Sequence, residues 1–263
     1  MPRAFAAPET MNLKPLLSQL DEQGIDYRLI KRDGQLELWV SDEQLAQRIH
    51  DVFVRVEAAQ TARVFSFQNV KIAPVTAMFV LISIVVAVVT QLGTAFTEPL
   101  QIADLIHYPR SWHWELSPEY LIRLFTPMFL HFSLGHIVFN MIGLWYLGLL
   151  LEHRIGHGLM FALVMTISLI SNIAQLVISG PLFGGFSGVV YGLLGFACVY
   201  QYWVKPLGIP KGLFVFAGVW LLLGLVDAFT IIGIYVANTA HISGLIAGML
   251  LAVLWLWWHK LTS

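Results

Sequence analysis

Six long apolar segments constrain the fold of this chain more than any other feature of its sequence. We predict them at residues 74–92, 131–151, 158–179, 187–204, 212–230 and 239–258. Each segment approaches the roughly 20 residues that an α-helix needs to cross about 30 Å of hydrocarbon. Isolated strands are excluded, because an open sheet edge in lipid leaves backbone groups without hydrogen-bond partners. The sequence therefore predicts an all-α polytopic membrane protein, with a bundle of six transmembrane helices in residues 74–263.

The composition agrees with a chain that lies largely in lipid. Charged residues make up 12% of the sequence, and the mean hydropathy is +0.73. A typical soluble domain is about one quarter charged. The net charge of -1 gives no indication of nucleic-acid binding. The single cysteine, Cys198, excludes a disulfide within the chain.

Charged residues are concentrated instead in the first 60 residues, where three local signals indicate a helix, a β-hairpin and a second helix. The signals are the helical spacing of Leu13, Leu16, Leu17 and Leu20, the Asp33-Gly34 turn between residues 27–30 and 36–40, and the capping box of Ser41 and Gln44. We predict a small soluble α+β domain at residues 1–60 and a linker at 61–73. Residues 1–11 lack the apolar core of a signal peptide; we expect them to be disordered, or Met11 to be the true start.

The basic residues predict the orientation of the six spans. They lie before the first span, between the second and third spans, between the fourth and fifth spans, and after the sixth span. In chain order they are Arg55, Arg63, Lys71, Arg154, Lys205, Lys211 and Lys260. Cytoplasmic loops carry the excess of lysine and arginine, so both termini and the first 60 residues are expected in the cytoplasm. The opposite loop at 93–130 is rich in aromatic residues, namely Tyr108, Trp112, Trp114, Tyr120 and Phe125. We expect it to lie partly in the outer leaflet, with an ordinary external loop as the alternative.

Four polar side chains share one shallow layer of the predicted bundle. With this orientation, the second, fourth and sixth spans begin at the outer surface, and all four residues lie within about ten positions of those outer ends. They are His136, Asn140, Ser187 and His241. Polar residues within spans are costly in lipid and indicate a functional site by default.

Ser187 stands in the sequence Gly184-Gly185-Phe186-Ser187-Gly188, at the predicted start of the fourth span. The glycines allow a tight loop that runs directly into a helix, whose N-terminus is positive. Developing negative charge is stabilised there, as an oxyanion requires. A simple tight turn is the alternative interpretation. The spacing differs from the G-x-S-x-G elbow of soluble hydrolases.

His241 begins a helical face of small residues, and the fourth span carries a similar face. The two faces consist of His241, Gly244, Gly248 and Ala252, and of Gly188, Gly192 and Gly195. Small residues let transmembrane helices approach closely. We therefore expect the imidazole of His241 within reach of the Ser187 hydroxyl, as a base beside a nucleophile. A structural histidine on a packing helix is the alternative.

His136 and Asn140 are four residues apart on one face of the second span, where both can donate hydrogen bonds to an oxyanion. A polar pair that joins two helices is the alternative. His131 points about 140° away from His136 and is expected to brace the loop. The main acid near a span is Asp227, which is not well placed to orient His241. A Ser-His dyad is therefore favoured over a triad, and the absence of an H-E-x-x-H pattern argues against a metal site.

Taken as a set, three motifs resemble the rhomboid protease family. They are His131-x4-His136-x3-Asn140, Gly185-Phe186-Ser187-Gly188 and Ala240-His241-x2-Gly244-x3-Gly248. The resemblance covers residues 12–258 and is closest to bacterial members that carry a soluble domain before six spans. Two loop positions depart from the pattern: Ile122 replaces a tryptophan, and Pro127 replaces a histidine.

The resemblance implies an intramembrane serine endopeptidase with Ser187 as nucleophile and His241 as general base. It implies an oxyanion site formed by His136, Asn140 and the Ser187 amide, and a tyrosine, Tyr191, that stacks on the histidine. Transmembrane proteins in a bacterial inner membrane would be its substrates, with no cofactor, metal or nucleic acid. A non-catalytic rhomboid-like binding protein is one alternative. A small transporter is the other, although the internal repeat common in transporters is missing between the two halves.

Overall fold

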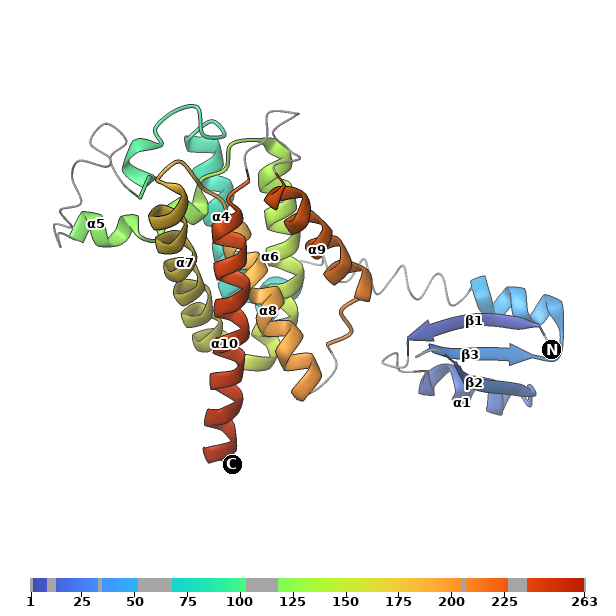
Figure 1. The fold of residues 1–263 in the computed structure, drawn as a ribbon. Helices are drawn as coiled ribbons and strands as arrows, with labels where there is room; N and C mark the ends of the chain where they lie inside the picture. Colours follow the sequence, from blue (N-terminus) through green and yellow to red (C-terminus); the bar gives the residue numbers. More distant parts are fainter. Residues whose placement is uncertain are drawn as a thin grey trace. The chain divides into compact units, whose positions relative to one another are not determined.

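The computed structural model describes residues 2–8, 13–32, 35–51, 68–102, 118–204, 207–226 and 236–262. The chain divides into two compact units, Met1–Phe67 and Gln68–Ser263 (Figure 1). The division falls within the stretch that the sequence predicts as a linker.

The first unit contains a three-stranded antiparallel sheet in the order β1-β3-β2 (Figure 1). Its elements are β1 (Arg3–Pro8), α1 (Lys14–Glu22), β2 (Tyr27–Arg32), β3 (Gln35–Val40) and a helix at residues 43–51. Side chains from the strands and both helices form one hydrophobic cluster, which includes Phe5, Leu20, Leu38, Val40 and Ile49. The predicted helix–hairpin–helix order is present, while the Asp33-Gly34 turn lies outside the described residues.

The sequence prediction was wrong at two points in this unit. Residues 3–8 are not disordered, because β1 pairs with β3 and buries Ala4, Phe5 and Ala7. That pairing joins segments about 30 residues apart, which local sequence signals do not reveal. The helix at 43–51 is capped by Asp42, not by Ser41: the Asp42 carboxylate accepts a hydrogen bond from the Leu45 backbone N–H at 2.9 Å.

The second unit is a helical bundle whose helices lie close to the predicted apolar segments. Its elements are α3 (Gln68–Ile72), α4 (Pro74–Val89), η1 (Glu98–Leu100), α5 (Pro118–Arg123), η2 (Thr126–Phe129), α6 (Leu134–Ile155), α7 (His157–Ser179), α8 (Ser187–Trp203), α9 (Lys211–Leu225) and α10 (Asn238–Thr262). Within the described residues, α6, α7 and α10 are long and apolar enough to cross a membrane, and α4 and α9 are shorter apolar helices. Tyr108, Trp112 and Trp114 of the aromatic loop lie outside the described residues.

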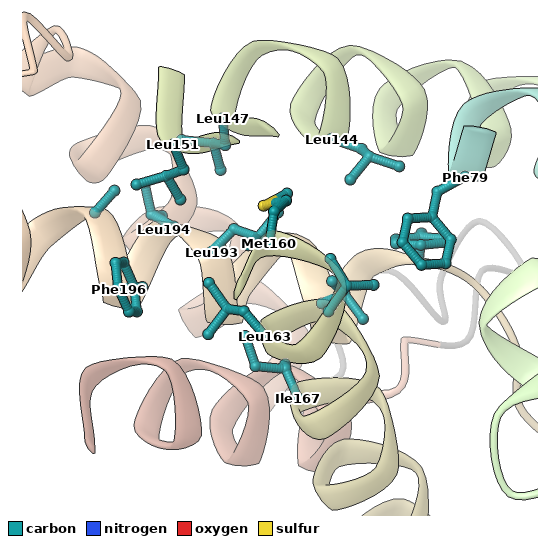
Figure 2. Close-up of a cluster of buried hydrophobic side chains, with 14 of the residues drawn as sticks. Phe79, Leu144, Leu147, Leu151, Met160, Leu163, Ile167, Leu193, Leu194 and Phe196 are labelled. Carbon is teal, nitrogen blue, oxygen red and sulfur yellow. The ribbon is translucent and has the colours of Figure 1, made fainter. Parts of the chain in front are cut away.

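Large apolar side chains fill the space between α4, α6, α7 and α8 (Figure 2). The buried set labelled there is Phe79, Leu144, Leu147, Leu151, Met160, Leu163, Ile167, Leu193, Leu194 and Phe196. Apolar side chains also point outward, with 72% of Val88, 73% of Ile178 and 64% of Leu222 exposed. In water such a surface would be a liability, but in lipid it needs no cover. The bundle is then held mainly by close packing and buried polar contacts.

One buried carboxylate joins three helices at the C-terminal end of α6. Glu152 accepts hydrogen bonds from the backbone N–H groups of Val75 and Thr76 and from the Thr76 hydroxyl, at 2.9, 2.8 and 2.6 Å. The imidazole of His157, the first residue of α7, lies 2.7 Å from the same carboxylate. Glu152 thus satisfies N–H groups in the first turn of α4 that have no partner within the helix.

Candidate active site

The loop before α8 is held in place by backbone and aromatic contacts. The Gly185 N–H donates to the Pro127 carbonyl at 3.0 Å, a bond that does not depend on the Pro127 side chain. Gly185 has φ of +112°, which a residue with a side chain rarely adopts. Phe186 is fully buried against Phe79 and Phe129. The chain then enters α8 at Ser187, so the hydroxyl stands at a helix N-terminus.

The structure brings Ser187 and His241 into hydrogen-bond contact. The Nε2 atom of His241 lies 2.7 Å from Oγ of Ser187, although the residues are 54 positions apart. The glycine faces of α8 and α10 make this approach possible. A methyl group on Gly244 would overlap the Gly188 carbonyl, and one on Gly248 would overlap the Gly192 carbonyl. The two backbones therefore touch directly, as small-residue faces allow.

The ring of His241 is buried and oriented by an aromatic neighbour. Tyr191 stacks on it with ring centroids 4.6 Å apart and an angle of 21° between the planes. The Tyr191 hydroxyl in turn donates to the Ala217 carbonyl of α9 at 2.8 Å. Nδ1 of His241 has no hydrogen-bond partner among the described residues. Asp227 lies outside them, so the described geometry is that of a pair.

His136 and Asn140 converge beside the serine loop. A methyl group on Gly185 would lie 2.5 Å from Nε2 of His136 and 3.3 Å from Nδ2 of Asn140, so both nitrogen atoms face the space that this glycine leaves open. Asn140 is buried, and its Nδ2 has no hydrogen-bond partner in the described part of the chain. An unpaired buried donor such as Asn140 Nδ2 is uncommon.

His131 contributes to the loop rather than to this pair of donors. Its Nδ1 lies 3.0 Å from the Phe129 carbonyl, and its ring packs edge-on against His136 at 5.0 Å. The bracing role of His131 stays a prediction. Within the described ranges, no three histidine, cysteine or acidic side chains gather in an arrangement that could hold a metal ion.

Two further polar residues near His241 were not recognised from the sequence. The side-chain oxygen of Gln175 on α7 accepts a hydrogen bond from the Ala240 N–H at 2.9 Å, in the turn that carries His241. The amide of Asn238 donates to the Gly224 carbonyl at 2.7 Å. The rule that polar residues within membrane helices are functional by default would have selected Gln175.

A model of the Rhomboid domain matches residues 118–258, a stretch that contains all of these site residues. The chain belongs to the rhomboid family. Among curated relatives, the Rhomboid protease GlpG of Serratia proteamaculans is 33% identical over 279 residues, covering 96% of each chain. The proteins of the same name from Photorhabdus laumondii and Salmonella typhi are 34% and 32% identical, covering 84% and 85% of this chain and 83% and 86% of theirs. The similarity to these rhomboid proteases therefore extends over both units of the chain.

Proposed function

We propose that this chain, an intramembrane serine protease of the rhomboid family, cleaves transmembrane segments near the outer membrane face with a Ser187–His241 dyad. The single observation that carries the proposal is the 2.7 Å contact between His241 Nε2 and Ser187 Oγ. A hydroxyl is a weak nucleophile until an adjacent base removes its proton. This contact also favours a protease over the non-catalytic rhomboid-like binding protein and the transporter, because neither needs a base against a hydroxyl.

In the proposed reaction, Oγ of Ser187 attacks the carbonyl carbon of the scissile peptide bond while Nε2 of His241 accepts the hydroxyl proton. The tetrahedral intermediate collapses when the C–N bond breaks and His241 passes that proton to the leaving amine. An ester with Ser187 remains. Water, deprotonated by the same imidazole, attacks the ester carbonyl. The C–Oγ bond then breaks, His241 returns the proton to Oγ, and the new carboxyl group is released.

The negative oxygen of the intermediate would be stabilised by three donors. These are Nε2 of His136, Nδ2 of Asn140 and the backbone N–H of Ser187 at the start of α8. The support is the convergence of the two side-chain nitrogens beside Gly185 and the unpaired state of Asn140 Nδ2 among the described residues. Donors held ready in a water-poor site need no reorganisation when charge develops.

We further propose six spans with both termini in the cytoplasm of a bacterial cell, in its inner membrane. The distribution of basic residues supports this orientation. The 17 residues of α8 reach about 26 Å, less than the thickness of the hydrocarbon core. If α8 ends at the inner surface, Ser187 lies just below the outer one. Water would enter through a pocket on that side. The segment at 231–238 is predicted to cover this pocket, and its residues 231–235 lie outside the described residues.

The test is cleavage of a transmembrane substrate by the purified protein in detergent or liposomes. Wild type should cut the substrate, whereas Ser187→Ala and His241→Ala should leave it intact with unchanged helical content. Mapping of the products should place the cut near the outer end of the substrate helix. Turnover by Ser187→Ala equal to wild type would rule out this nucleophile.

A further inference from the structure

Helix α9 is the least buried helix around the proposed dyad, yet it makes hydrogen bonds with two residues that lie next to His241. Most of its apolar side chains face outward, including Val215 and Leu222, each 64% exposed. Of its fifteen residues, all of them described, only Gly224 is buried. One contact is the bond from the Tyr191 hydroxyl to the Ala217 carbonyl, behind the ring that stacks on His241.

The other contact is made by Asn238, the first residue of α10 and three positions before His241. Its Nδ2 donates to the Gly224 carbonyl at 2.7 Å. The N-cap is the preceding residue, Ala237, whose carbonyl accepts the first helical hydrogen bond from the His241 N–H at 3.2 Å. Here Oδ1 is buried without a partner in the described residues. Among the described residues, the hydrogen bonding of this side chain is therefore with α9.

The lack of a side chain at Gly224 leaves room for the Asn238 amide. A methyl group there would collide with the Asn238 side chain, with Oδ1, Cγ and Nδ2 as its three nearest atoms. Gly218, on the same helix, has nothing within 4 Å of the equivalent position. Gly224 is thus required by the contact with Asn238, whereas Gly218 is not required by any neighbour.

We propose that Asn238 is a positioning residue for the reaction: its bond to Gly224 lets α9 hold the first turn of α10, and hence His241, against Ser187. Tyr191 gives α9 a second connection to the same ring. His241 is then aligned with the serine only while α9 is packed in place. The inference rests on the proposed Ser187–His241 dyad.

The experiment uses the purified full chain and measures the rate at which a small fluorophosphonate labels Ser187, together with kcat and KM for a transmembrane substrate. The variants are Gly224→Ala, Asn238→Ala and their combination, with Gly218→Ala as the matched control. A displaced catalytic group can lower the rate by about a hundredfold. We expect each single variant to slow labelling and kcat by about ten- to a hundredfold with little change in KM, and Gly218→Ala to match wild type.

The double variant separates positioning from general damage. Once Asn238 is alanine, a methyl on Gly224 has no amide to displace, so the combination should be no slower than Asn238→Ala alone. Wild-type labelling rates in both single variants, effects confined to KM, or losses that multiply in the double variant would overturn the proposal.

Asn238→Asp provides an independent measurement if Asn238→Ala does not fold. Aspartate keeps the shape and is favoured in the first turn of a helix, but its ionised carboxylate cannot donate to the Gly224 carbonyl, so labelling is measured at a pH that keeps this carboxyl ionised. We expect slow labelling with normal thermal stability, and a wild-type rate would contradict the proposal. Labelling of Ser187→Ala would instead refute the dyad, whatever the α9 variants do.

Discussion

Replacement of Glu152 by alanine should destabilise the bundle far more than loss of a surface charge. The carboxylate accepts hydrogen bonds from two backbone N–H groups and one hydroxyl at the start of α4. All three donors would be left without this acceptor. The first turn of α4 has no other intrahelical partner for those N–H groups, and Glu152 itself is only 1% exposed.

The magnitude follows from these bonds. A donor left unsatisfied in a buried position costs about 1–3 kcal/mol, so three donors would sum to about 3–9 kcal/mol. We expect a value near the lower end, because the hydrogen bond from the Val75 N–H is only partly buried. Glu152→Gln keeps one acceptor oxygen and should cost about half of this. His157→Ala removes only the hydrogen bond between the imidazole and the carboxylate. Because the His157 side chain is 56% exposed, that loss should stay below about 1 kcal/mol.

The assay is equilibrium unfolding of the purified protein in mixed detergent micelles with increasing SDS, followed by circular dichroism. The expected order of destabilisation is Glu152→Ala, then Glu152→Gln, then His157→Ala. If Glu152→Ala unfolds within about 1 kcal/mol of wild type, the carboxylate does not cap α4 in the way described. If His157→Ala costs as much as Glu152→Ala, the contact between His157 and Glu152 dominates and the capping explanation is wrong.

Three other predictions follow from the same structure. Gly248→Ala places a methyl against a carbonyl oxygen of α8 that cannot move aside. This variant should lower the free energy of unfolding by about 1–3 kcal/mol and should also lower the rate of substrate cleavage. Gly212→Ala, with open space around the added methyl, should change neither. Asn140→Ala should lower kcat by at most about a thousandfold, which is the effect of losing one oxyanion donor, and should leave KM unchanged. An unaltered kcat would show that Asn140 is not part of the oxyanion site. The hydrogen bond from Arg3 lowers the pKa of Glu37 below its ordinary value of 4.5, so this pair stabilises the sheet above that pH and the stabilisation is lost as the pH falls through the lowered pKa. Protection factors of the β3 amides, with the intrinsic exchange rate at each pH divided out, should fall on acidification more in wild type than in Arg3→Gln. An equal fall in both proteins would refute the assignment.

Hydropathy and charge placed the helices of the second unit well. The predicted start at residue 187 coincides with the first residue of α8, and the predicted segment at 158–179 differs by one residue from α7. Long apolar runs give this accuracy because length and composition suffice to define a helix in lipid. The contact between Ser187 and His241 was predicted from the spacing of small residues on the two helices that carry them. This spacing is a periodic property of each helix and can be read from the sequence.

The parts that were missed depend on contacts between distant segments. The strand at Arg3–Pro8 exists because β3 offers an edge to pair with, and its own residues are not a strong strand signal. The role of Glu152 requires the start of α4, which lies 76 residues earlier. The bond from Asn238 to Gly224 requires the packing of α9 on α10. Spacing within one helix carries no information on such pairs.

The central claim is that the Ser187 hydroxyl is the nucleophile and that His241 activates it. The most direct measurement is mass spectrometry of the purified full chain after treatment with a fluorophosphonate. Wild type should form one covalent adduct, on Ser187, and His241→Ala should not form it. An adduct on a different residue, or an undiminished Ser187 adduct in His241→Ala, would contradict it.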